Sequence, residues 1–194
     1  MQRTLWDFGV SKSPEEELEV YDLFCGIGGF STGATLAGHR VVVAADCEKK
    51  MLVWHRANHP NAQHVRATLP RDEHKLGLPG PESAKRWLLH GSPPCVKLSA
   101  AKWEKTQEEI DDALDMIRWY FELALRQKPT FWTFEQVAVK RVLDVCETFR
   151  KQHPHSFAYA VVRCSDYGIP QMRRRVLGGS PKLIHALLKK RGTF

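Results

Sequence analysis

Short apolar runs recur along the chain and are separated by polar or charged segments. The run at 19–24 predicts a buried strand, and Val41-Val42-Val43-Ala44-Ala45 lies within a second strand at 39–45. Between these strands, residues 30–37 suit a helix that stops at Gly38. The same pattern predicts three more strands, at 85–90, 130–134 and 156–162.

The clearest helix covers residues 107–126, and helices are also expected at 48–58 and 137–153. In the helix at 107–126, apolar residues recur at three- and four-residue spacing, namely Ile110, Leu114, Ile117, Phe121 and Leu125. Residues 60–83 are rich in proline, glycine and charge, and are expected to be irregular. Strands that alternate with helices imply crossover connections, so the pattern predicts an α/β fold with a mainly parallel sheet. Ligands of such sheets gather at the carboxyl ends of the strands.

Length and composition are those of a globular chain of one-domain size. The 194 residues are 43% apolar and 26% charged, which excludes a disordered or collagen-like chain. No apolar run approaches the roughly 20 residues of a membrane span, and no N-terminal segment has the pattern of a secretion signal. We therefore expect no membrane partner.

The cysteines favour an intracellular, reducing compartment. They are five in number, with no Cys-x-x-Cys pair and no zinc-ligand spacing. We expect free thiols and no metal site. The candidate nucleophiles are Cys25, Cys47, Cys95, Cys146 and Cys164.

Positive charge is concentrated at the C-terminal end of the chain. The net charge is +7, from 29 basic and 22 acidic residues. No acid follows Asp166, whereas seven basic residues do, so the preceding part is neutral with 29 − 7 = 22 basic residues. A polyanion partner and a solvated basic tail both explain this distribution.

A glycine-rich turn follows the first expected strand, in Asp22-Leu23-Phe24-Cys25-Gly26-Ile27-Gly28-Gly29-Phe30. Glycines at this place let the backbone turn tightly and approach a ligand closely. Asp46 ends the next strand, 17 residues beyond Gly29, which is about the spacing of a carboxylate that binds a ribose. A purely structural turn is the alternative to a nucleoside-containing cofactor.

Two further strand ends carry reactive groups. In Gly91-Ser92-Pro93-Pro94-Cys95 the prolines stiffen the approach of a cysteine, which is either a nucleophile or a buried, inert thiol. In Phe134-Glu135-Gln136-Val137 a carboxylate leaves an apolar strand, and it either holds a proton or interacts with a helix dipole.

Arginines dominate Tyr167-Gly168-Ile169-Pro170-Gln171-Met172-Arg173-Arg174-Arg175-Val176. In an extended segment Gln171, Arg173 and Arg175 share one face, and Arg174 lies on the other. Two guanidinium groups beside an amide suit a phosphate or a base carbonyl. A basic edge strand is the alternative.

The order of these four motifs closely resembles that of the DNA cytosine-5 methyltransferase family, over residues 21–177. The resemblance implies the S-adenosylmethionine-dependent methyltransferase fold, Rossmann-like, with helices on both faces of the sheet. It divides the chain into a polar N-terminal extension at 1–19, a catalytic domain at 20–178 and a basic segment at 179–194. It also implies methyl transfer to C5 of cytosine in DNA.

The resemblance assigns roles to individual residues. Cys95 adds to C6 of the base, Glu135 protonates or hydrogen-bonds N3, and Arg175 holds O2 with Arg173 nearby. The cofactor S-adenosylmethionine lies against Phe24, Gly26, Ile27, Gly29, Asp46, Cys47 and Pro94. A lid over 96–103 and the arginine segment contact DNA, through Lys97, Ser99, Lys102, Gln171 and Arg174. The target base leaves the duplex, at a cost of roughly a few kcal/mol.

Several positions depart from the family pattern. Val96 stands where the family has Gln, Gln136 where it has an Asn that shapes the cysteine loop, and no acid is evident near Ala67. The target-recognition region and the final motif are not visible. A compact enzyme, one subunit of a split enzyme with a second protein chain, and an inactive binding module remain as alternatives, and so does an RNA substrate.

The N-terminal segment Gln2-Arg3-Thr4-Leu5-Trp6-Asp7-Phe8-Gly9 partly resembles a sliding-clamp-binding peptide. Gly9 occupies the place of the second aromatic residue. The alternative is that Leu5, Trp6 and Phe8 pack on the body of the protein.

Overall fold

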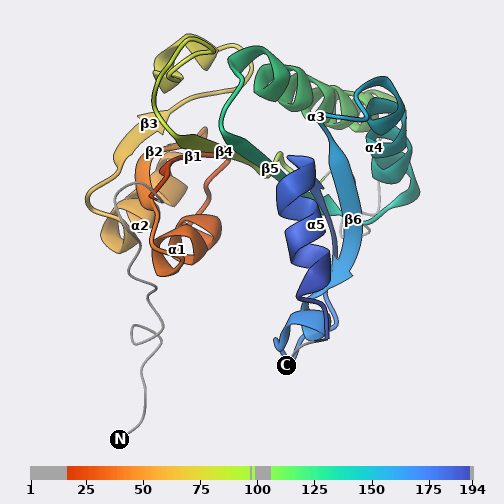
Figure 1. The fold of residues 1–194 in the computed structure, drawn as a ribbon. Coiled ribbons are helices and arrows are strands. Elements are labelled where there is room, and N and C mark those ends of the chain that lie inside the picture. The colour runs from red at the N-terminus through yellow and green to blue at the C-terminus, as the bar shows by residue number, and fades with distance from the viewer. Residues whose placement is uncertain (1–16, 97, 99–105, 193–194) are drawn as a thin grey trace, which may run out of the picture. The chain divides into compact units, whose positions relative to one another are not determined.

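The computed structural model describes residues 17–96, 98 and 106–192. Its contacts group the chain into two units (Figure 1). The N-terminal unit comprises the chain up to Gly91 together with Gln127–Thr130, and the C-terminal unit comprises Ser92–Arg126 and the chain from Phe131 onward. The expected division into a catalytic domain at 20–178 with flanking segments stays a prediction.

The N-terminal unit is built on parallel strands in the order β3-β2-β1-β4. The chain leaves β1, adds β2 and β3 on one side, and returns to place β4 on the other side. The carboxyl end of β1 therefore lies where the strand order reverses, the usual ligand position in such sheets. The elements are β1 (Glu19–Leu23), α1 (Gly29–Leu36), β2 (Arg40–Asp46), α2 (Lys49–Asn58), β3 (Gln63–Arg66), the 3₁₀ turn η2 (Glu73–Leu76) and β4 (Trp87–Gly91).

The core of this unit consists of side chains from the apolar runs, which form its strands. Val20, Leu23, Ala44, Ala45 and Leu89 are fully buried. Helices α1 and α2 lie on the same side of these strands (Figure 1). Each parallel step needs such a crossover, because two-residue turns cannot join parallel strands.

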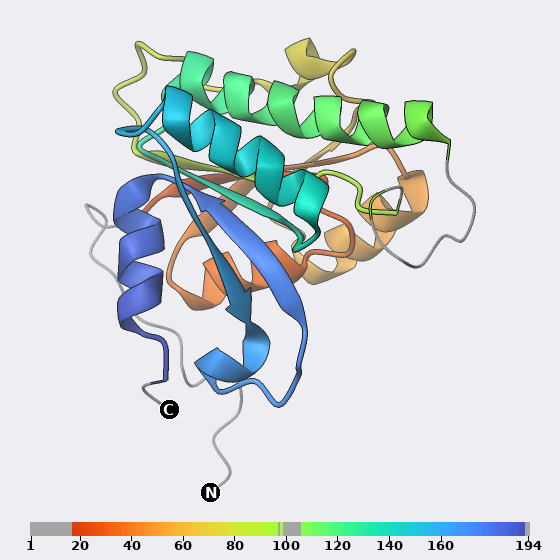
Figure 2. The same cartoon turned by 90° about the vertical axis from the view of Figure 1, so that its right-hand side faces the viewer.

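In the C-terminal unit, β7 lies between β5 and β6 and is antiparallel to both. Helices α3 and α4 lie side by side on one face of these strands and α5 covers the other (Figures 1 and 2). The elements are α3 (Gln107–Gln127), β5 (Phe131–Val137), α4 (Lys140–Gln152), β6 (Ala158–Arg163), η3 (Cys164–Tyr167), β7 (Arg174–Gly179) and α5 (Pro181–Lys189).

An aromatic cluster fills this second core, with Phe121 at its centre. The Phe121 ring lies 4.8 Å from that of Phe134 and 4.9 Å from that of Phe157, measured between centroids. Two glycines of β7 permit this packing. A Cβ on Gly178 would meet the Phe157 ring at 2.8 Å, and a Cβ on Gly179 would overlap the Trp132 carbonyl oxygen.

The predicted α/β fold class is confirmed, and the structure adds detail that the pattern did not supply. Residues 60–83 are not wholly irregular, because they contain β3 and η2. β7 is not an edge strand. The basic C-terminal segment includes α5, whose Ile184 is buried, and Arg191 pairs with Asp166 at 2.6 Å. Within the described ranges, no helix combines the length and apolar character that crossing a membrane requires.

Candidate functional site

The glycine turn after β1 has the backbone conformation that its sequence requires. Phe24, Gly26 and Gly28 have φ values of 61°, 53° and 99°, in the region where side chains cost energy. The Gly28 N–H donates to the Cys25 carbonyl at 3.0 Å, which closes the turn. A Cβ at Gly26 or Gly29 would face open space. The turn therefore presents bare backbone to any ligand at the carboxyl end of β1.

Asp46 connects the end of β2 to this turn. Its Oδ2 accepts a hydrogen bond from the Gly26 N–H at 3.0 Å, and its Oδ1 accepts one from the Glu48 N–H at 2.9 Å. Each carboxylate oxygen has two lone pairs, so both oxygens retain acceptor capacity. Cys47 is exposed beside it, and its carbonyl accepts from Arg66 Nε at 3.1 Å.

The structure brings an acid close to Ala67 from five residues away in the chain. Asp72 Oδ2 accepts from the N–H of Thr68 at 2.8 Å. Hydrogen bonds from Arg71, from this N–H and from Lys75 hold the pKa of Asp72 well below its usual range. Ala67 itself is buried, and its N–H donates to the Asp46 carbonyl at 3.1 Å. Asp72 is thus engaged in closing its own loop.

The cysteine loop belongs to the C-terminal unit, where Gln136 fastens it to β5. Gln136 Nε2 donates to the Pro93 carbonyl at 2.9 Å, and its Oε1 accepts from the Val137 N–H at 2.8 Å. Gln136 is 1% exposed. The longer side chain at this position therefore contacts the cysteine loop directly. Cys95 is a half-buried free thiol, and Pro94 next to it is exposed.

Glu135 and Arg175 form an ion pair on adjacent strands. Arg175 Nε lies 2.7 Å from Glu135 Oε1, and the two side chains are 20% and 31% exposed respectively. The register of β5 and β7 places Arg175 opposite Val137, so Glu135 is its diagonal neighbour. Arg175 Nη1 also donates to the Arg174 carbonyl at 2.7 Å. Among the described residues, no hydrogen bond joins the Cys95 thiol to either side chain.

The remaining predicted residues are divided between exposed and undescribed positions. Gln171, Arg173 and Arg174 are exposed. β7 begins only at Arg174, so strand alternation does not settle which way Gln171 faces. Lys97, Ser99 and Lys102 lie outside the described residues, as does the segment 2–9.

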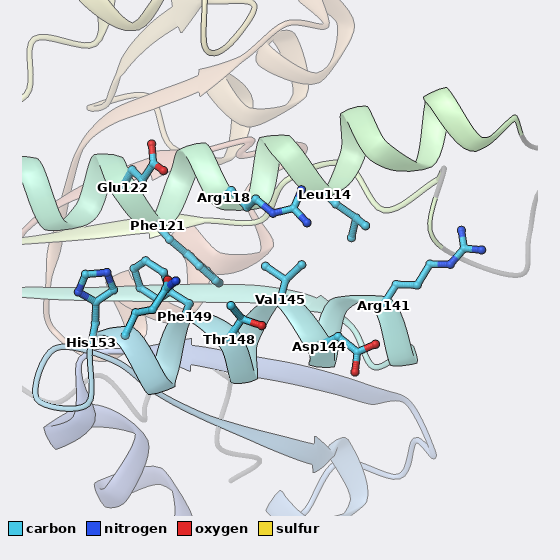
Figure 3. A pocket seen from close by; sticks show the side chains of 11 residues that line it. Leu114, Arg118, Phe121, Glu122, Arg141, Asp144, Val145, Thr148, Phe149 and His153 are labelled. Atoms are coloured by element: carbon cyan, nitrogen blue, oxygen red, sulfur yellow. The ribbon is translucent and has the colours of Figure 1, made fainter.

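A cavity of about 450 Å³ lies between α3 and α4 and is separate from these groups (Figure 3). Its floor is formed by Phe121, Val145 and Phe149, and its rim carries Arg118 and Arg141. It contains none of the predicted site residues.

Sequence reasoning missed a group of polar side chains beneath the glycine turn. Asp22 is fully buried at the end of β1, and the Ser31 hydroxyl donates to its Oδ2 at 2.6 Å. Burial raises the pKa of Asp22 to about 7. His55, Asn58 and His59 approach the same turn from α2. Their spacing at i, i+3 and i+4 places them on one helix face, which is the signal that could have found them.

Comparison with known proteins gives one consistent result. The profile of the C-5 cytosine-specific DNA methylase family matches residues 18–179. The type II methyltransferase M1.HphI of Haemophilus parahaemolyticus is 27% identical over 168 residues, covering 82% of this chain and 45% of the relative. The type II methylase M.HgiDII of Herpetosiphon aurantiacus is 26% identical over 173 residues, covering 81% and 45%. This chain spans just under half the length of these relatives.

Solved structures share the fold. A putative DNA modification methyltransferase encoded within an E. coli prophage superposes with a TM-score of 0.61 at 24% identity, covering 87% of this chain and 48% of that one. The Dnmt2 methyltransferase of S. pombe superposes with a TM-score of 0.57 at 20% identity, covering 84% and 49%. These likenesses establish the methyltransferase fold that the motifs predicted.

Proposed function

Because this chain belongs to the C-5 cytosine-specific DNA methylase family, we propose that it transfers a methyl group from S-adenosylmethionine to C5 of cytosine in DNA. One observation carries the proposal beyond family membership. The hydrogen bond from Gln136 to Pro93 ties the loop of Cys95 to the strand that bears Glu135. The loop of the nucleophile and the strand of the acid are therefore joined directly. A reaction that uses both groups requires their positions to be fixed in this way.

The residues of the N-terminal unit fit the cofactor. Asp46 offers free lone pairs to the ribose hydroxyls, and Gly26 and Gly29 leave backbone open for close approach. Ile27 adds an apolar side chain that is 58% exposed. Phe24 and Cys47 flank these groups, and Pro94 is proposed as a further cofactor residue. When bound, S-adenosylmethionine supplies an electrophilic methyl group on a sulfonium.

In the proposed chemistry, Cys95 makes C5 of the base nucleophilic. The thiolate adds to C6, the C5–C6 double bond opens, and the electron pair moves toward N3 and O2. Glu135 donates a proton or hydrogen bond at N3, and Arg175 holds O2. After methylation, loss of the C5 proton and expulsion of the thiolate from C6 restore the aromatic ring. Each group thus stabilises charge that develops during the reaction.

The ion pair suits this role because a guanidinium carries five N–H donors. Nε contacts Glu135, and Nη1 contacts the Arg174 carbonyl. Among the described contacts, Nη2 carries no hydrogen bond, so it can serve O2 while Nε still orients the carboxyl group. Arg175 would then position Glu135 and bind the base together.

DNA contacts are proposed for the exposed arginine segment and for the predicted lid. Gln171, Arg173 and Arg174 would contact phosphates and bases, with Lys97, Ser99 and Lys102. Each phosphate contact releases counterions, so affinity for DNA should fall steeply with salt. A second chain that supplies target recognition remains an alternative to activity of this chain alone.

A covalent trap tests the mechanism. DNA that contains 5-fluorocytosine is incubated with the protein and S-adenosylmethionine, because fluorine at C5 cannot leave as a proton does. The expected result is a complex that survives a denaturing gel and disappears in Cys95→Ala. Cys164→Ala is the matched control, because Cys164 is also a half-buried free thiol of the C-terminal unit and should still form the complex.

Two outcomes would overturn parts of this proposal. A complex that persists in Cys95→Ala would remove the role of that thiol. No complex with DNA, but one with RNA that carries the same base, would change the substrate. If neither forms, adding candidate partner chains separates a split enzyme, which would then react, from an inactive module.

A further inference from the structure

The last turn of α2 holds the glycine turn from beneath. Asn58 Nδ2 donates to the Ile27 carbonyl at 3.1 Å. His59 Nε2 lies 3.3 Å from the Gly28 carbonyl oxygen and 3.1 Å from Thr32 Oγ1. Thr32 Oγ1 already donates its proton to Gly28 at 2.8 Å, so His59 must be the donor to both oxygens. Two successive carbonyls of the turn therefore accept hydrogen bonds from the C-terminal end of α2 and its C-cap residue, and the Gly28 carbonyl also accepts from the Thr32 N–H at 2.9 Å.

The two histidine rings also occupy the space beside Gly28. A Cβ on Gly28 would meet the His59 ring at 2.8 Å and the His55 ring at 3.2 Å. Gly28 has a φ of 99°, which a side chain would disfavour even without these rings. The turn and the helix end therefore have complementary shapes as well as hydrogen bonds.

A buried chain of hydrogen bonds supports His55 in this position. It runs from His64 Nε2 to His55 Nδ1 at 2.9 Å, from His55 Nε2 to Ser31 Oγ at 3.1 Å, and from Ser31 to Asp22 at 2.6 Å. Because Ser31 donates to Asp22, it must accept from His55, which leaves His55 Nδ1 to accept from His64. The chain thus links β3, α2, α1 and the end of β1.

These side chains are not arranged as a metal site. Within the described ranges, no group of three or more histidine, cysteine or acidic side chains is placed to hold a metal ion. The ring nitrogens of His55 and the Nε2 atoms of His59 and His64 are instead turned toward one another, toward hydroxyl groups of α1 or toward the glycine turn. Their contacts are those of a support for the turn.

We infer that Asn58 and His59 are positioning residues for the cofactor, an inference that rests on the proposed function. In a trans peptide the C=O and N–H point in opposite directions. With the Gly28 carbonyl directed at His59, the Gly29 N–H points away from α2. Gly29 begins α1, and no side-chain cap has been formed there, so its N–H is one of the donors that a helix leaves for a ligand. His59 thus helps to fix the orientation of the Gly29 N–H on the cofactor side, and Asn58 fixes the preceding peptide, whose N–H closes the turn on the Cys25 carbonyl.

The test measures binding of S-adenosylhomocysteine, the demethylated product, by calorimetry. Asn58→Leu should weaken affinity about five- to thirtyfold, because the Ile27 carbonyl loses its side-chain donor. His59→Leu should weaken affinity by a smaller factor, because the Gly28 carbonyl keeps the hydrogen bonds from the N–H and Oγ1 of Thr32. His59→Gln should recover most of the affinity, since its amide can place a donor near the position of Nε2. Lys50→Ala is the matched control, on an exposed position of the same helix, and should bind as the wild type does.

Two further readouts separate positioning from general stability. The unfolding temperature without ligand should stay close to that of the wild type in Asn58→Leu, because Asn58 is exposed. In methyl transfer, the KM for the cofactor should rise while kcat at saturation is retained. A fall in kcat alone, or equal affinity in wild type, Asn58→Leu and His59→Leu, overturns the inference and leaves the proposed function standing. If the wild-type protein does not bind the product at all, the proposed function itself fails, and the inference with it.

Discussion

The two units hold their functional groups in different ways. In the N-terminal unit the glycine turn is held by backbone bonds, by Asp46 and by the end of α2, so many weak contacts from several elements fix one stretch of backbone. In the C-terminal unit Glu135 and Arg175 hold each other, and one amide, Gln136, holds the cysteine loop. The first arrangement is redundant and the second is not.

This difference predicts different responses to substitution. A binding surface built from many contacts should lose affinity in steps, because each contact contributes independently. Catalytic groups that act together on the same base should lose nearly all of their activity when one of them is removed. Single substitutions in each unit test this contrast.

Glu135→Gln should lower methyl transfer about 10²- to 10⁴-fold, the usual range for loss of a general acid. The amide keeps the size of the side chain but cannot give up a proton to N3. Product affinity should be unchanged, because Glu135 is not among the cofactor residues. Single-turnover transfer and calorimetry measure the two quantities. An equal loss of both would mean that the two units do not divide the work in this way.

Asp46→Asn should weaken product affinity about 10- to 100-fold, with kcat retained at saturating cofactor. Hydrogen bonds to a charged group contribute about 1.5–3 kcal/mol each, and the amide would also set an NH₂ group against the N–H of Gly26 or Glu48. Calorimetry measures the loss. Glu48→Gln, at the exposed neighbouring position, serves as the control and should bind normally; a comparable loss there would argue against a specific role of Asp46.

Gln136→Asn should lower the free energy of unfolding by about 1–3 kcal/mol, because the shorter amide leaves the Pro93 carbonyl without its donor. Covalent trapping should slow as the cysteine loop loosens, while the product still binds. Urea unfolding and the rate of adduct formation report these effects. Trapping at the wild-type rate would show that the loop does not depend on this contact.

The sequence located the groups that lie at strand ends. Asp46 and Glu135 follow apolar runs, and such runs become strands wherever a core is available to bury them. β3 escaped detection because Val65 is the only buried residue among its four, so no apolar run marks it. β7 begins with two arginines, which concealed a strand that pairs on both sides.

Contacts between distant residues could not be predicted in this way. Asn58 reaches a carbonyl 31 positions earlier in the chain, and Gln136 reaches one 43 positions earlier. Helical spacing can show that Asn58 shares a face with two histidines, but nothing local identifies the carbonyl that either amide reaches. Their partners depend on how a helix end or a strand packs, which is a property of the folded chain.

The pH dependence of stability tests the N-terminal unit, because Asp22, His55 and His90 all lie in it. Burial raises the pKa of Asp22 from 3.8 to about 7, so between these values the native state holds a proton that the unfolded chain releases. Stability from this group is full below about pH 4 and is lost as pH rises through 7. Burial lowers the pKa of His55 to about 4 and that of His90 to about 3. The two histidines change stability with pH in the opposite direction. Below the ordinary histidine pKa the unfolded chain binds protons that the folded protein does not bind, so their contribution to stability grows as pH rises.

Asp22→Asn removes the contribution of Asp22 to the pH dependence of stability and leaves those of the two histidines. Urea titrations at pH 5 to 8 measure the free energy of unfolding of the variant and of the wild type. Up to about pH 6.5 this free energy should rise more steeply with pH in the variant, and near pH 7 it should not decline. One group contributes at most about 1.4 kcal/mol per pH unit, and the histidines offset part of it. Ser31→Ala removes a hydrogen bond that lowers the pKa of Asp22, so its decline should move to higher pH. Parallel curves for wild type and Asp22→Asn would show that the buried carboxyl does not titrate in this range.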